Sequence, residues 1–346
     1  MWNLCIAVSI LLLTACTGDS AGVPEVVRVE GATVLVTSES ETLSQPSDVT
    51  LDEVGNIYVL DRLRAQVLVF APSGVLLETM GREGSGPREF QRPQSLAVTQ
   101  DSVRVVDNGN GVLQTLARES DFERRTPLPI GTSANTIAVA NDGGLLGSTL
   151  GAQDALAIFQ GPSGNEVARL GHSSLPARMA LDLVEMKRDI IAGKLPAIVQ
   201  NAALPAFAPN GDMWLILTSQ GIVQRYGRDG SLLLAVPFET PEKAAIWSAC
   251  IAWNKEIVND QRRLCMPTYA TDASDDGVIL WVLLNMPEDD PSVVVGFAST
   301  GKLVHRIRYR DVTGARQFAL DRARERIVFT IESTASVVAA AFPVGL

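Results

Sequence analysis

Few side chains in this chain have the types and spacing that catalysis requires. The only histidines are His172 and His305, and the four cysteines show neither a CxxC pair nor the Cys/His spacing of a zinc site. No Ser-His-Asp arrangement can be read, and the Gly-Ser-Gly at 84–86 lacks the Lys-Ser/Thr and the helix of a phosphate-binding loop. The sequence therefore favours a binding protein over an enzyme, although a site assembled from distant residues stays open.

Charged and amide side chains gather instead in three loops of the first third of the chain. Loops carry function when a rigid scaffold positions them. The residues expected to contact a ligand or partner there are Arg62, Arg64, Arg82, Arg88, Asp107, Asn108 and Asn110. A structural interpretation stands beside this one: Asp61 and Asp107 accept backbone N–H groups of the turns that follow them. The arginines would then only tie loops to neighbouring carboxylates, which contributes little if they are exposed.

These loops connect short strands in a pattern that begins at Pro46. The runs 47–52, 57–61, 66–70 and 75–81 are alternating or rich in β-branched residues, and turn residues separate them. Four short strands within about four dozen residues are typical of one blade of a β-propeller. The pattern restarts at Pro93, which indicates a repeat protein.

Six such units follow one another along the chain. They cover 46–81, 93–131, 134–171, about 204–238, 269–309 and 317–342. Glycine-containing turns recur between the first and second strands and between the third and fourth, as tight hairpins require. The sixth unit supplies only three strands, so we expect the N-terminal run at 26–37 to complete it and remove an open sheet edge. The predicted fold over 26–346 is an all-β, six-bladed β-propeller with N-terminal strand closure.

The loop Gly84-Ser85-Gly86-Pro87-Arg88-Glu89-Phe90, the following Pro93 and the strand ending Val105-Val106-Asp107 resemble the repeat of NHL-type six-bladed propellers. The chain is also similar to bacterial lipoproteins described only as six-bladed β-propellers. Arg88 stands where typical repeats have their third glycine. The resemblance implies the architecture of the whole body and says little about activity.

The sequence does not show the metal-binding residues that known propeller enzymes use. Amidating lyases of this fold use a histidine-rich metal centre, and gluconolactonase-type enzymes use a Glu-Asn-Asp metal set in the channel. The predicted inner strands offer Asp48, Asp52 and Asp321 without a matching Asn and Glu. No metal or other cofactor is therefore predicted, with Ca or Zn reserved for the alternative of a metal-dependent hydrolase or lyase.

Two insertions interrupt the repeat, at about 175–203 and 241–266. The first carries Met179, Leu183, Met186 and Ile190, and the second Ile246, Cys250, Trp253 and Ile257, both at helical spacing. We expect both helices to pack onto the propeller and to rise from the face that carries the three loops, roofing half of the channel mouth.

The first residues predict export and a lipid anchor. Residues 1–15 form an apolar run of signal-peptide length, and Leu13-Thr14-Ala15-Cys16 resembles a bacterial lipobox. Lipidation of Cys16 would leave 16–25 as a tether. Thr17 after the cysteine favours the outer membrane.

In an oxidising compartment Cys250 and Cys265 could form a disulfide worth about 3 kcal/mol, or remain two separate buried thiols. The residues alone do not choose between these states. The formal net charge of −10 argues against nucleic-acid binding. The sequence thus predicts a monomeric, lipid-anchored module of the cell envelope that binds an envelope protein or a small ligand.

Overall fold

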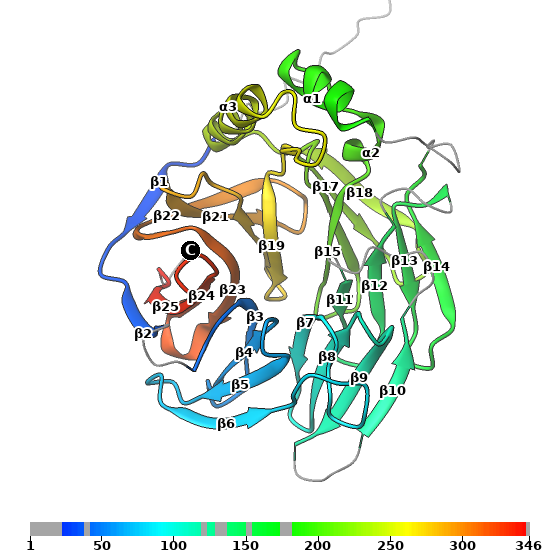
Figure 1. Cartoon of the computed structure of the whole chain (residues 1–346), viewed down its shortest axis with the longest axis vertical. Helices are drawn as coiled ribbons and strands as arrows, with labels where there is room; N and C mark the ends of the chain where they lie inside the picture. The colour runs from blue at the N-terminus through cyan, green and yellow to red at the C-terminus, as the bar shows by residue number, and fades with distance from the viewer. Residues whose placement is uncertain are drawn as a thin grey trace, which may run out of the picture.

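The computed structural model describes residues 23–37, 42–118, 123–128, 137–149, 154–173 and 182–343. The predicted signal peptide, Cys16 and Met179 lie outside these residues. The described strands form six sheets arranged in a ring around a central axis (Figure 1). The predicted six-bladed β-propeller is therefore confirmed.

Each blade is an antiparallel meander whose first strand faces the axis. In blade order the strands are β3 (Pro46–Leu51), β4 (Ile57–Asp61), β5 (Gln66–Phe70) and β6 (Leu76–Met80); β7 (Pro93–Val98), β8 (Ser102–Asp107), β9 (Val112–Ala117) and β10 (Glu123–Pro127); β11 (Ile137–Val139), β12 (Leu145–Ser148), β13 (Ala157–Gln160) and β14 (Glu166–Leu170); β15 (Ala203–Phe207), β16 (Met213–Leu217), β17 (Ile222–Tyr226) and β18 (Leu232–Pro237); β19 (Ala270–Asp275), β20 (Ile279–Leu284), β21 (Pro291–Ala298) and β22 (Leu303–Thr313); and β23 (Ala315–Asp321), β24 (Arg326–Ile331) and β25 (Ser336–Ala341).

The N-terminal run closes the ring but does so with only half of its length. β2 (Thr33–Val36) pairs antiparallel with β25, with Val34 opposite Val338, and so completes blade six. β1 (Val26–Val29) instead pairs in parallel with β22 and becomes a fifth strand of blade five. Gly31, at φ +84°, lies between the two strands in a conformation that favours glycine. The run predicted as one closing segment therefore divides between neighbouring blades.

Glycine turns join the strands of blades one, three, four and five as the repeat predicts. The turn glycines between first and second strands and between third and fourth all have φ between +77° and +92°: Gly55, Gly74, Gly143, Gly164, Gly211, Gly230, Gly277 and Gly301. In the first blade-to-blade loop Arg88 itself adopts φ +56°. This explains why typical repeats place glycine at that position. Phe90, which ends the same loop, is fully buried against Gly81.

Arginines link neighbouring blades beside the hairpin turns. Arg118 of blade two lies 2.9 Å from Asp52 of blade one and over the Tyr58 ring, 5.6 Å from its centroid. Arg228 of blade four joins Asp142 of blade three at 2.6 Å. Cation–π contacts of this kind are worth about 0.5–1 kcal/mol when exposed and more when desolvated. Arginine links therefore add to the apolar packing between blades.

The two insertions form helices at the edge of the ring. The first holds α1 (Leu183–Ile191) and α2 (Ala197–Gln200), and the second holds α3 (Pro241–Glu256). Both α1 and α3 lie beside the ring in Figure 1 rather than over its centre, so the expected roof over the channel is wrong. No helix among the described residues is long and apolar enough to span a membrane.

The helical stripes are confirmed with one correction. Met186, Ile190, Ile246 and Cys250 are buried as predicted. Trp253, however, is 40% exposed, and Asn254 is fully buried in its place. The side-chain amide of Asn254 is satisfied in this buried position: Nδ2 donates to Cys265 O, and Oδ1 accepts Cys265 N.

Candidate functional site

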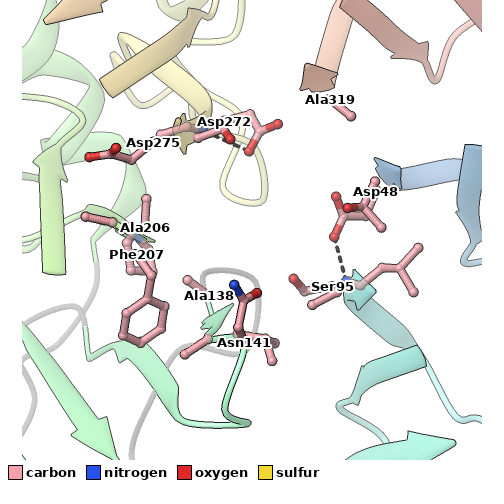
Figure 2. A pocket seen from close by; sticks show the side chains of 18 of the residues that line it. Asp48, Ser95, Ala138, Asn141, Ala206, Phe207, Asp272, Asp275 and Ala319 are labelled. Atoms are coloured by element: carbon pink, nitrogen blue, oxygen red, sulfur yellow. Dashed lines mark hydrogen bonds between the residues drawn. The ribbon is translucent and has the colours of Figure 1, made fainter. Parts of the chain in front are cut away.

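A cavity of about 660 Å³ runs along the axis of the ring. The inner strands of all six blades line it, and it extends to the turns that join first and second strands. Small side chains on these strands, such as Ala138, Ala206 and Ala319, leave the space open, while Phe207 covers part of the wall (Figure 2). A pocket of this size can hold a small molecule.

A shared backbone irregularity places polar residues around this channel. In blades one, two, five and six the pairing between the first and second strands shifts near the start of the inner strand. Asp48, Ser95, Asp272 and Gln317 are the residues directly after this shift, and each lines the cavity. β-Bulges often re-aim side chains next to functional sites. The repeat therefore builds a polar ring from equivalent positions.

Asp48 accepts two backbone hydrogen bonds. Leu96 N, in the neighbouring blade, donates to Oδ2 at 2.6 Å, and Val49 N donates to Oδ1 at 2.8 Å. Asp48 is half-buried, and it lines the cavity. This burial raises the pKa of Asp48 to about 7, against the lowering effect of its hydrogen bonds.

Asp272 repeats this arrangement in blade five. Phe318 N donates to its Oδ2 at 2.8 Å, and Ala273 N donates to its Oδ1 at 2.8 Å. Burial raises the pKa of Asp272 well above its usual value, and the charge of Asp48 raises it further. The two carboxyls face the same cavity (Figure 2). Near neutral pH such a pair prefers to hold a proton or to meet a cation.

Acids nearer the mouth differ because they have close partners. Asp142 pairs with Arg228, and Asp276 pairs with Arg322 and accepts Trp281 Nε1 at 2.8 Å. Asp275 accepts Trp214 Nε1 at 2.6 Å, and burial raises its pKa. Asp48 and Asp272, by contrast, form no ion pair with a lysine or arginine of the described chain.

The channel offers acids, amides and hydroxyls as its polar groups, together with Arg228 and Arg322, which pair with Asp142 and Asp276. Among the described ranges no group of three or more His, Cys, Asp or Glu is arranged to hold a metal ion. The arrangement can accept hydrogen bonds from a bound cation, and its two acids can exchange protons with a ligand.

The structure places the predicted loop residues away from this channel. None of Arg62, Arg64, Arg82, Arg88, Asp107, Asn108 and Asn110 is among the residues that line the cavity. Most hold their own loops: Arg64 Nε donates to Ser44 Oγ at 2.7 Å, and Arg82 pairs with Glu89 at 2.6 Å. Their part in binding a partner stays a prediction.

The structural interpretation is supported for Asp61, whereas Asp107 accepts a side-chain amide of the following turn and a backbone N–H of the loop before its blade. Buried Asp61 accepts the backbone N–H groups of Leu63 and Arg64, both at 3.1 Å. Buried Asp107 accepts Asn110 Nδ2 at 2.6 Å and Gln91 N at 2.8 Å. These carboxylates fix the loops that follow their strands.

Sequence reasoning named Asp48 as an inner-strand acid without assigning it to a site, and it did not name Asp272. Of the three inner-strand acids named from the sequence, Asp52 binds Arg118 and Asp321 binds Arg326, so only Asp48 lines the cavity. The signal for Asp272 was its position in the repeat. Pro46-Ser47-Asp48 and Ala270-Thr271-Asp272 are equivalent starts of inner strands, and aligning the units would have paired them.

Comparisons with known proteins agree with the fold. A family model described as a 6-bladed beta-propeller matches residues 27–146. No curated protein matches the chain. Among solved structures, a streptogramin B lyase superposes with a TM-score of 0.52 at 12% identity, over 87% of this chain and 94% of that one.

Two further solved structures give the same result. The virginiamycin B lyase of Staphylococcus aureus has a TM-score of 0.53 at 10% identity, over 90% of this chain and 99% of its own. A Bacteroides fragilis protein inferred to be exported has a TM-score of 0.51 at 12% identity, over 91% and 99%. At such identities the likeness shows the propeller fold alone.

Proposed function

We propose that this protein is a binding module whose central channel takes a small, positively charged ligand. The observation that supports this is the pair Asp48 and Asp272, which face one cavity without a cationic partner among the described residues. A buried carboxylate without a counter-charge is costly, and a bound cation removes that cost.

A protonated amine suits the channel better than a metal ion. Each carboxyl already accepts two backbone N–H groups, so only part of its lone pairs remains free for a ligand. An ammonium group donates three hydrogen bonds and can use such scattered acceptors. The remaining wall, with Ala138, Ala206 and Phe207, can contact the carbon chain of the ligand.

Calorimetric titration with putrescine and its neutral analogue 1,4-butanediol tests the proposal. At pH 8 we expect putrescine to bind at least tenfold more tightly than the diol, and to weaken as the pH falls through about 7 and Asp48 takes up a proton. The double variant D48N/D272N should lose the preference. Asp289→Asn, an exposed acid outside the cavity, serves as the matched control. Equal binding of amine and diol would reject the cationic ligand class.

We further propose that the module is held at the outer membrane through lipidated Cys16. The lipobox-like Leu13–Cys16 supports this, and acyl chains add about 0.8 kcal/mol of membrane affinity per buried methylene. Mass spectrometry of the mature N-terminus from the native host decides the matter, since an unacylated Cys16 would exclude the anchor.

A further inference from the structure

The two cysteines of the second insertion both contact Asn254, which lies in the last turn of α3. Both are free thiols: Cys250 is buried on the helix, and Cys265 is half-buried in the segment that follows. Asn254, one turn after Cys250, holds the two near each other. Its Nδ2 lies 3.6 Å from Cys250 Sγ and 2.9 Å from Cys265 O, while its Oδ1 accepts Cys265 N at 3.0 Å.

The segment that carries Cys265 also holds the first insertion. Lys187 of α1 is fully buried, and its Nζ donates to the carbonyl oxygens of Asp260 and Arg263, the latter at 3.0 Å. A buried ammonium requires such partners, because an unsatisfied one is strongly destabilising. The segment between α3 and blade five therefore holds α1 in place through these two carbonyls, which are called the seat of Lys187 below.

We propose that Cys250 and Cys265 form a redox latch: as a disulfide they lock the segment 257–266 onto α3 and thereby fix the seat of Lys187. The sequence left open a disulfide or two separate thiols. Both are free thiols in the structure, and their shared contacts with Asn254 place them near each other on one stretch of the chain. The latch is independent of the channel and of the ligand proposed for it.

The two thiols have different parts in the oxidation. Cys265 is partly exposed, and the hydrogen bond from Cys250 lowers the pKa of its thiol. Its thiolate attacks a sulfur of a small disulfide such as oxidised glutathione, which forms a mixed disulfide and releases one glutathione thiolate. Cys250 then loses its proton and displaces the second glutathione. The protein gives up two electrons and two protons, and the oxidant becomes two thiols.

The first measurement is a peptide map of the reduced full chain before and after treatment with oxidised glutathione. We expect a Cys250–Cys265 cross-link and a rise in Tm of about 4 °C, since the cross-link restricts the unfolded chain. Stable glutathione adducts on Cys265, or unreacted thiols, would overturn the proposal.

The second measurement distinguishes a latch from a disulfide without consequence. Amide hydrogen exchange of α1 should slow about tenfold on oxidation, because the carbonyls that bind Lys187 lie in the locked segment. Cys265→Ala provides the matched control: it keeps both carbonyls, and oxidant should leave its Tm and its exchange unchanged. If the wild-type cross-link forms and the exchange of α1 does not change, the coupling to α1 is wrong.

Discussion

At the scale of single residues, the channel acids make the protein's stability depend on pH in an unusual direction. Burial raises the pKa of Asp48 from 3.8 to about 7. Between these values the folded chain keeps a proton that the unfolded chain has lost. Stability from this group therefore falls as the pH rises from about 4 to about 7. Most aspartates, which gain partners on folding, act in the opposite sense.

The variant D48N should show this effect directly. It cannot ionise, so its free energy of unfolding relative to wild type should rise between pH 4 and pH 8, by about 2 kcal/mol once water in the channel is allowed for. Urea unfolding at pH 4, 6 and 8 measures it. D289N should follow the wild-type curve at each pH. Parallel curves for D48N and wild type would show that Asp48 titrates normally.

At the scale of elements, a buried ion cluster joins α3 to blade five. Glu242, in the first turn of α3, accepts Arg306 Nη2 at 2.6 Å and Arg308 Nη2 at 3.1 Å. Burial opposes its charge, yet the hydrogen bond from Arg306 holds the pKa of Glu242 below its usual value. This contribution to stability is present above the unfolded pKa of about 4.3 and is lost as the pH falls through the lower folded value.

Removing the carboxylate should loosen the helix at neutral pH. E242Q leaves two arginines without their counter-charge, and breaking a buried pair from one side costs about 3 kcal/mol. Denaturant unfolding and hydrogen exchange of α3 report the loss. Glu256→Gln, an exposed acid at the other end of the same helix, should change stability by less than about 0.5 kcal/mol. A similar small effect for E242Q would mean that the cluster is not desolvated.

At the scale of the whole molecule, the ring depends on β2. Val36 is 6% exposed and packs in a core with residues of blades one and six, whereas Val34 on the same strand is 54% exposed. V36D should destabilise the whole propeller by about 3 kcal/mol or more, because it buries an unpaired charge where the N-terminal strand β2 completes blade six. V34D is the matched control and should be nearly neutral. Thermal unfolding followed by circular dichroism compares them, and equal midpoints would show that closure does not limit stability.

The sequence predicts the blades well because hairpin chemistry is local. Gly55 and Gly74 indicate turns because glycine readily adopts the positive φ that these turns need, and turn glycines recur at equivalent positions in later blades. The division of the N-terminal run between β1 and β2 is not local. It depends on blade five offering the edge of β22, a strand almost three hundred residues away.

The candidate site was predicted only in part for the same reason. Asp48 is visible as an acid on an inner strand, but its channel partner Asp272 comes from four blades further on and is buried by the ring as a whole. The loop residues Arg62 and Arg82 stood out because charged loop residues are easy to read. In the structure their side chains pair with Glu332 and Glu89. Sequence spacing alone does not show whether such an arginine binds a neighbouring glutamate or a ligand.

The place where β1 leaves the ring has a consequence for how the proposed lipid anchor would hold the molecule. β1 runs along the outermost edge of blade five, and Arg306 Nη1 donates to Pro24 O at 2.9 Å, so the chain departs from the circumference. A lipid attached upstream would therefore hold the propeller by its outer edge and not by one of its two faces. The opening of the channel would then face sideways into the surrounding fluid and stay reachable by diffusing solutes while the protein is moored.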